Sequence, residues 1–262
     1  MSTALMTARR MIGADVAKVG RRAGTVVWAA VLAILPLVIY FIVAAIQHSS
    51  NPTSDRPAGG AHGFSIGLQI LVFFFGPLSA MMVGVQAGLG DSAAGVFREL
   101  VVTGRSRLSL FASRIPGALL VALSILTVAF AIDVIGTIVF RSGAHDPSAG
   151  TILKSWGFLL LSDGVVCVVV VGLAAALDSR VASLISFIGC ELILFPALVN
   201  DNGLGSFREV FLDSAVRHID PAPLSNDRFH VPMTTGAVVL TFVLWTAIAC
   251  ALGAWRTWRL EA

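Results

Sequence analysis

Three carboxylate side chains, those of Asp133, Asp163 and Glu191, lie inside long apolar stretches of the sequence. A carboxylate at the centre of a membrane-spanning helix costs about 2.5 to 3.5 kcal/mol to insert, whereas each Leu, Ile, Val or Phe contributes only about 0.3 to 0.6 kcal/mol. Such acids usually face a bundle interior or water, so these three are candidates for a translocation path. The alternative is a protonated or hydrogen-bonded structural acid, and Asp133 could also snorkel outward.

The expected depths of these acids follow from the helical rise of 1.5 Å per residue. Glu191 lies about 16 Å from Arg180, which places it near the middle of the membrane. Asp163 lies about 10 Å below the outer border, and Asp133 is also in the outer half. Glu191 is therefore expected to matter for transport more than for assembly.

Motifs for other chemistry are missing from the sequence. It contains no G-x-x-x-x-G-K-[ST] phosphate loop, no H-E-x-x-H, no nucleophile elbow and no dinucleotide fingerprint. The three cysteines form no CxxC pair, and the five histidines show no ligand spacing. We therefore expect no catalytic residue, no metal site and no cofactor in this chain, and any energy source must lie in another subunit or an ion gradient.

The residues Gly88-Leu89-Gly90-Asp91 spell G-x-G-D, which resembles the motif around one catalytic aspartate of presenilin-like intramembrane proteases. Those enzymes need a second aspartate, commonly after a tyrosine, but the only tyrosine here is Tyr40, followed by Phe41. Helix termination at the glycines followed by an aspartate cap explains the four residues adequately, so the protease interpretation is discounted. A protease using Asp91 remains the third functional alternative.

The elements that position these residues are membrane-spanning helices. The chain is 56% hydrophobic and 13% charged, with a mean hydropathy of +0.88, whereas a soluble domain is about 25% charged. Continuous apolar runs near 20 residues fit helices, whereas barrel strands alternate and are about 10 residues long. The sequence predicts an all-α polytopic protein with six spans, over 25–46, 64–89, 115–139, 156–177, 181–199 and 235–255.

Orientation follows from the basic residues of the loops. With a cytosolic N-terminus, the inner side holds twelve Lys and Arg residues and the outer side six. Both termini are therefore predicted to be cytosolic. The net positive charge of the chain is explained by the basic residues that set its membrane topology. It indicates no nucleic-acid partner, since no basic face is interleaved with exposed aromatics.

The sequence divides into a short N-terminal helical segment and one membrane domain. Residues 1–23 form an amphipathic helix with a basic face, suited to anionic lipid at the inner surface, or simply hold topology-setting charges. Residues 24–262 form the six-helix domain. Its first outer loop, 48–63, is rich in Pro and Gly and is expected to be loosely ordered.

The last outer loop, 201–232, predicts a short amphipathic helix. Ser206 and Glu209 make a capping-box pair, and the helix is expected to end by Asp220-Pro221. The apolar face comprises Leu204, Phe207, Val210 and Phe211, and the polar face Arg208, Glu209, Asp213 and Arg217. Packing against the spans and gating of an exit are both open.

Span two contains a helix-disrupting proline followed by a face of small residues. Pro77 after Gly76 removes a backbone donor and predicts a kink. Ala80, Gly84 and Gly88 follow at four-residue spacing, which allows close approach of another helix.

The segment 91–107 lies between spans two and three on the cytosolic side and is short, amphipathic and basic. Asp91 or Ser92 can cap a helix whose apolar residues Phe97, Leu100 and Val101 would fit an apolar cleft. Arg98, Glu99 and Arg105 would form a charged rim that sets register. An interfacial helix lying on lipid is the alternative.

This segment resembles the pattern found in permease subunits of ABC-2-type ABC transporters. The family has a glycine, a leucine-rich stretch, a threonine and a serine-arginine pair leading into span three, and this sequence has Gly95, Leu100, Thr103 and Ser106-Arg107 at the corresponding places. Gly104 stands where the family usually has proline. The six spans, the basic N-terminal helix and the patterned loop after span five extend the resemblance over nearly the whole chain.

The resemblance implies that 91–107 is a coupling helix that docks on a separate ATP-binding subunit, which would hold ATP and Mg. It also implies a second permease copy or a homologous permease. The expected function is export of a drug, lipid, peptide or natural-product-like substrate across a bacterial plasma membrane. A secondary transporter or channel that uses the intramembrane acids is the main alternative.

Overall fold

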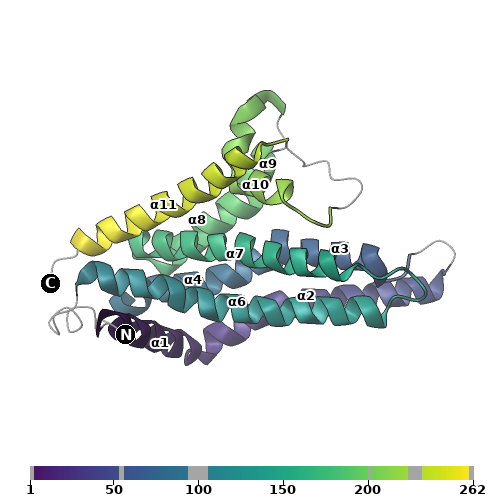
Figure 1. The fold of residues 1–262 in the computed structure, drawn as a ribbon, viewed down its shortest axis with the longest axis horizontal. Helices are drawn as coiled ribbons and strands as arrows, with labels where there is room; N and C mark the ends of the chain where they lie inside the picture. Colours follow the sequence, from purple (N-terminus) through teal and green to yellow (C-terminus); the bar gives the residue numbers. More distant parts are fainter. Residues whose placement is uncertain (1–2, 53–55, 94–105, 200–201, 224–231, 260–262) are drawn as a thin grey trace.

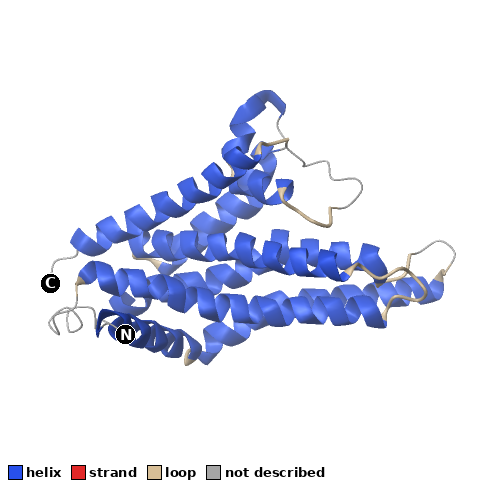
Figure 2. Ribbon diagram, viewed as in Figure 1, coloured by secondary structure: helices blue, strands red, loops and turns tan. Residues whose placement is uncertain are grey.

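The computed structural model describes residues 3–52, 56–93, 106–199, 202–223 and 232–259. Among these residues every regular element is a helix, and loops join them (Figure 2). The order is α1 (Thr3–Gly20), α2 (Ala23–Ser50), α3 (Gly60–Ile70), η1 (Leu71–Phe75), α4 (Gly76–Ala93), α6 (Arg107–Val139), α7 (Ala149–Leu177), α8 (Arg180–Ile188), η2 (Gly189–Leu194), α9 (Phe195–Val199), η3 (Asn202–Val210), α10 (Leu212–His218) and α11 (Thr235–Arg259).

Six helical stretches are long and apolar enough to cross a membrane, as the sequence predicts. Span one is α2, span three is α6, span four is α7 and span six is α11. Span two runs through α3, η1 and α4 to Leu89, and span five runs from Arg180 to Val199. The chain is thus an all-helical, multi-pass membrane protein.

Helix α7 forms the centre of the bundle because it packs against α4, α6 and α11 (Figure 1). In its most apolar window 72% of the residues are buried, against 12% in span five, which therefore lies at the periphery. The approach of α7 to α11 is closest at Gly172, where a Cβ would overlap the backbone carbonyl of Ala249. Helix α11 diverges from α7 toward α9 and α10 (Figure 1).

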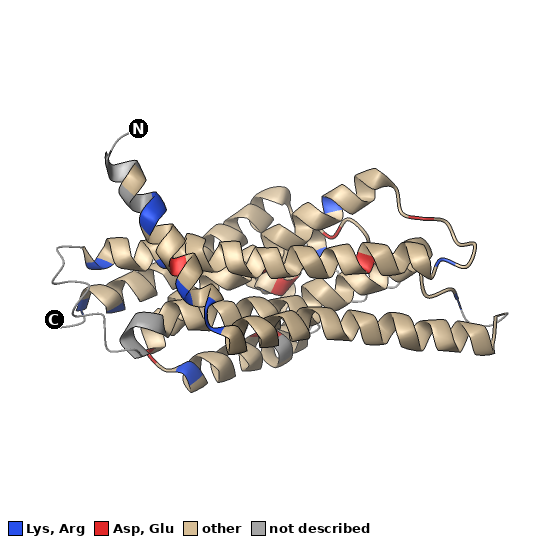
Figure 3. Ribbon diagram, turned by 90° about the horizontal axis from the view of Figure 1, so that it is seen from below, with Lys and Arg blue, Asp and Glu red and all other residues tan. Residues whose placement is uncertain are grey.

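The two ends of the bundle differ in charge. Figure 3 shows Lys and Arg concentrated toward the end at which both chain termini lie. The C-terminal end of α4 and the N-terminal end of α6 lie at this same end (Figure 1). Helix α1 packs along α6, where the Ser113 hydroxyl donates to Asp15 Oδ2 at 2.6 Å.

Two of the spans contain a π-helical turn immediately before a proline. In span two, η1 precedes Pro77, and the Gly76 amide donates to the Leu71 carbonyl five residues earlier. In span five, η2 precedes Pro196, and the Phe195 amide donates to the Cys190 carbonyl. A proline cannot donate to the preceding turn, and the wider turn accommodates it without ending the helix.

Three local predictions are wrong. The helix that forms the end of span two is not terminated by Gly88 or Gly90, because α4 continues to Ala93 and so includes the expected cap position Asp91. A glycine costs a helix only about 1 kcal/mol, which tertiary packing readily offsets. The first outer loop is partly ordered, since the Gly59 amide donates to Phe140 O at 2.9 Å and the Ala61 amide to His145 O at 2.8 Å.

The third error concerns the loop after span five, where one amphipathic helix is expected. The structure has a 3-10 helix, η3, interrupted by Gly205 at φ +51°, and then α10 beginning at Leu212. Phe207 is 59% exposed, whereas Asp213 is buried, so the predicted division into apolar and polar faces is wrong. The end before Asp220-Pro221 agrees with the prediction, as α10 ends at His218.

Candidate functional site

Asp163 lies near the middle of α7, because this helix begins at Ala149 and not at the expected Trp156. Its side chain is completely buried, and neither carboxyl oxygen has a hydrogen-bond partner within the described part of the chain. It faces Gly76 of span two, where a Cβ would stand 2.6 Å from Oδ2. The carboxyl thus occupies the space that a side chain at the π turn would fill.

Asp133 lies on α6 and is also completely buried without a hydrogen-bond partner among the described residues. Its carboxyl presses against Gly67 of α3, whose Cβ would overlap Oδ1. The snorkelling interpretation is therefore wrong, because α3 covers the side chain. Gly67 and Gly76 are nine residues apart, so the two aspartates meet span two at points about 13 Å apart.

Glu191 lies in η2 and is one of the residues that line an almost wholly apolar pocket of about 180 Å³ between α7, span five, α10 and α11. It is close enough to Asp163 and to Asp213 for electrostatic interaction with both. Asp163, Glu191 and Asp213 thus form a series of acids, each within electrostatic range of the next. Asp133 belongs to a separate position, against α3.

Buried hydroxyls extend this polar interior. Five of them have no hydrogen-bond partner within the described residues: Ser214 on α10, and four on α4, α6 and α7, namely Ser79, Thr137, Ser155 and Ser162. Buried polar groups normally find partners, and unpaired ones call for an explanation such as a ligand, an ion or water. The interface of these three helices thus holds polar atoms suited to a path or a bound group.

The segment after span five is anchored to this region. Arg217 forms an ion pair with Asp213 at 2.9 Å, and its guanidinium lies 4.2 Å from the ring centroid of Phe73 in η1. The Trp245 indole of α11 donates to Val210 O at 2.9 Å. Helix α10 therefore contacts the π turn of span two and also borders the pocket that Glu191 lines.

At the opposite end of the bundle, a buried hydrogen bond joins α4 and α6, the helices that flank the candidate coupling segment in the sequence. The buried Arg114 guanidinium of α6 donates to Gly88 O of α4 at 2.8 Å. Ser106 caps α6 by accepting from the Ser109 amide, and Arg107 donates to Trp258 O at 3.1 Å. Nearby, burial lowers the pKa of Lys18, although Asp15 partly opposes this shift.

The candidate coupling residues Phe97, Arg98, Glu99, Leu100, Val101 and Arg105 lie outside the described residues. Asp91 lies in the last turn of α4, and its side chain also lies outside the description. The small residues of span two are all described. Ala80, Gly84 and Gly88 are buried, and the two glycines lie against Val170 and Val171 of α7.

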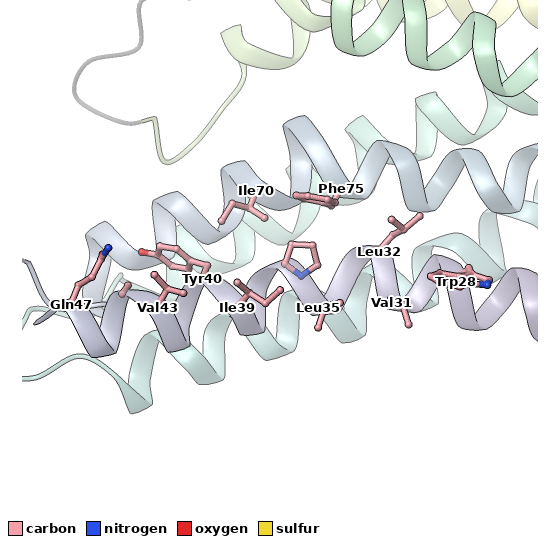
Figure 4. A pocket seen from close by; sticks show the side chains of 12 residues that line it. Trp28, Val31, Leu32, Leu35, Ile39, Tyr40, Val43, Gln47, Ile70 and Phe75 are labelled. Atoms are coloured by element: carbon pink, nitrogen blue, oxygen red, sulfur yellow. The ribbon is translucent and has the colours of Figure 1, made fainter. Parts of the chain in front are cut away.

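A second hollow is an open apolar groove between α2 and span two (Figure 4). It measures about 650 Å³, and its few polar groups are the Tyr40 hydroxyl, the Trp28 indole and the Gln47 amide. The side chains come from one flank of α2 together with Ile70 and Phe75 (Figure 4). This groove contains no charged side chain and is separate from the cluster of acids.

Among the described residues, no group of three His, Cys, Asp or Glu side chains could hold a metal ion. The sequence matches no protein-family model and no curated protein. The function must therefore be argued from the residues themselves. The two regions to explain are the acidic cluster around Glu191 and the joined ends of α4 and α6.

Several residues of these regions carry no signal in the sequence. Gly67, which faces Asp133, is an ordinary glycine in an apolar run. Trp245 and Arg217 border the Glu191 region only because α11 and α10 fold back onto η1 and span five. The nearest available signal was the oppositely charged pair Asp213 and Arg217 at i, i+4 spacing, which is typical of any stable helix.

Proposed function

We propose that this chain is the permease subunit of an ATP-driven exporter of the ABC-2 type. It would pair with a second permease and two ATP-binding subunits that hold ATP and Mg. The substrate would leave the cell across a bacterial plasma membrane. The sequence of the segment 91–107 suggests the partner, and the six spans supply the membrane domain.

The observation that carries this proposal is the direct contact between α4 and α6, the two helices on either side of the candidate coupling segment in the sequence. The buried hydrogen bond from Arg114 to Gly88 O joins these helices close to the ends that flank the segment. A force on the segment would therefore move both helices together. A surface helix that only lies on lipid would not require the two flanking helices to be joined in this way.

A continuous route leads from this contact to the acids. Helix α4 carries motion to Pro77 and the π turn η1, where Gly76 contacts Asp163 and Phe73 contacts Arg217. Asp163 and Asp213 are both within electrostatic range of Glu191. Docking and ATP-driven closure of the partner would thus alter the surroundings of Glu191 through span two.

The direct test of the proposal is reconstitution with and without an ATP-binding subunit encoded beside this chain. We expect the two proteins to co-purify, and vesicles holding both to export substrate only with ATP. Transport driven by a proton gradient in vesicles holding this chain alone would contradict the proposal. The reading frames flanking the gene supply the candidate partner.

Glu191→Gln is expected to reduce transport strongly while leaving assembly with the partner intact. The substitution keeps the shape of the side chain and removes its charge, and Glu191 is remote from the joined ends of α4 and α6. Export kinetics in vesicles and co-purification from the same membranes measure the two effects. Unchanged export would remove Glu191 from the pathway.

A secondary transporter is the second candidate, favoured by the approach of Asp163 to Glu191. Two intramembrane acids within electrostatic range of each other are suited to carry protons or cations. In that case a proton gradient would drive transport without any partner. Asp163→Asn would then abolish this gradient-driven transport. If the chain is instead an ATP-driven exporter, the wild type would transport only with ATP.

A further inference from the structure

The open groove between α2 and span two is nearly as long as a membrane core is thick. Its α2 flank is apolar, and Leu35, Ile39 and Val43 of that flank are each about half exposed (Figure 4). From Trp28 to Gln47 the groove extends about 28 Å at the helical rise of 1.5 Å per residue, against about 30 Å for the hydrocarbon core of a bilayer. An acyl chain from one leaflet would therefore occupy about half of the groove.

The two ends of this groove differ in their chemistry. Trp28 forms the end nearer the chain termini, and its side chain is 62% exposed. Tryptophan is enriched at the membrane interface, where its ring lies at the level of the lipid head groups. Gln47, which is uncharged, forms the other end. The head group of a lipid whose chain enters the groove beside Trp28 would therefore lie at the start of α2.

Exposed positive charge surrounds the start of α2. Arg22 is the N-cap residue of this helix, and Arg21 precedes it; both are exposed. The rise from Arg22 to Trp28 is about 9 Å along the axis. The Arg22 guanidinium donates to Gln86 Oε1 of α4 at 3.5 Å. It therefore lies at the junction of α2 with span two, which is the junction that the groove follows.

This charge distinguishes between the possible occupants of the groove. Asp15 is the only acid among residues 1–24, and it accepts from the Ser113 hydroxyl of α6 at 2.6 Å, whereas Arg9 and Arg10 are exposed. Two copies of the chain in one membrane share their orientation, so two-fold packing of groove against groove would bring the arginines of both copies together. A phosphate head group instead complements them, because guanidinium and phosphate form strong charge-assisted hydrogen bonds.

We propose that the groove binds an anionic phospholipid, with its phosphate at Arg21 and Arg22 and one acyl chain along α2 from Trp28 to Ile39. The lipid belongs to the leaflet at the end of the bundle where both chain termini lie. Arg22 can bind the phosphate and Gln86 together, because a guanidinium has five N–H donors. The site does not depend on the exporter function proposed above.

The test measures quenching of tryptophan fluorescence by brominated lipids in vesicles that contain the purified full chain. The vesicles are phosphatidylcholine with a small, fixed fraction of lipid brominated on its acyl chains, supplied either as phosphatidylglycerol or as phosphatidylcholine. Because the chain has five tryptophans, Trp28→Phe identifies the share of the quenching that arises at the groove. We expect phosphatidylglycerol to be enriched beside Trp28 by about fivefold or more, as basic residues near anionic lipid produce.

Arg21→Gln combined with Arg22→Gln should remove this enrichment. Quenching by brominated phosphatidylcholine should stay unchanged in the same variant, which also shows that the chain is inserted. Arg21→Lys combined with Arg22→Lys keeps the charge and should retain the enrichment. Arg180→Gln is the matched control, because Arg180 is an exposed arginine at the start of α8, which provides none of the residues that line the groove.

Equal quenching of Trp28 by the two brominated lipids in the wild type would overturn the assignment, as would an enrichment that survives the two glutamine substitutions. Protection of Trp28 from both lipids would also overturn it, because a protein, such as a second copy of this chain, would then cover the groove. Either result would leave the exporter proposal standing, since co-purification with an ATP-binding subunit tests that proposal separately.

Discussion

Replacing Phe97 by Asp is expected to abolish co-purification of this chain with the proposed ATP-binding subunit. Phe97 is the largest apolar residue of the segment 91–107, and a buried aromatic anchor typically accounts for 2 kcal/mol or more of binding energy. A charge at that position would also be buried without a partner. We therefore expect affinity to fall by about 30-fold or more, measured by titration of the detergent-solubilised subunits.

The matched control for this variant is Arg98→Ala on the same segment. A rim charge affects the association rate and its salt dependence more than the strength of the complex. Arg98→Ala should therefore retain co-purification and ATP-driven export. If Phe97→Asp leaves both complex formation and export intact, the segment is not the docking site.

The second large effect concerns the packing of α7 against α11. Gly172→Ala should destabilise the bundle because its Cβ would meet the backbone of Ala249, which cannot rotate away as a side chain can. Overpacking of a tight interface typically costs about 1 to 3 kcal/mol. Thermal unfolding of the purified chain in detergent should show a lower midpoint.

Gly157→Ala provides the control on the same helix. Nothing lies within 4 Å of a Cβ built at Gly157, so the added methyl group meets no neighbour. Alanine also favours the helix over glycine by about 0.5 to 1 kcal/mol, so this variant should be neutral or more stable. Equal loss of stability in both variants would show that backbone contact at Gly172 is not the cause.

The spans could be predicted from the sequence because apolar length alone identifies them. Their ends could not, since α7 gains seven residues before Trp156, where polar residues such as Lys154 still permit a helix. Helix α4 runs through Gly88 and Gly90 because packing on α7 outweighs the weak helix propensity of glycine. The segment after span five divides at Phe211, where extended backbone (ψ 138°) separates η3 from α10.

The candidate site was predictable only in its acids. Glu191 and Asp163 stand out in the sequence because ionisable residues are rare within spans. Their proximity depends on how span five packs beside α7, and no local pattern encodes that packing. The sequence also gives no sign that aromatic residues line the same pocket as Glu191. Phe187, Phe195 and Trp245 lie in ordinary apolar runs, and only the packing of α11 against span five brings them together.

The π turn η1 also fixes the rotational phase of span two. A π turn holds one residue more than an α-helical turn, and one residue corresponds to about 100° of rotation around the helix axis. If the turn reverted to α-helix, α4 would rotate by that amount relative to α3. Gly76 would then move away from Asp163. A shift of α4 along its axis would therefore be coupled to rotation of α4 about that axis.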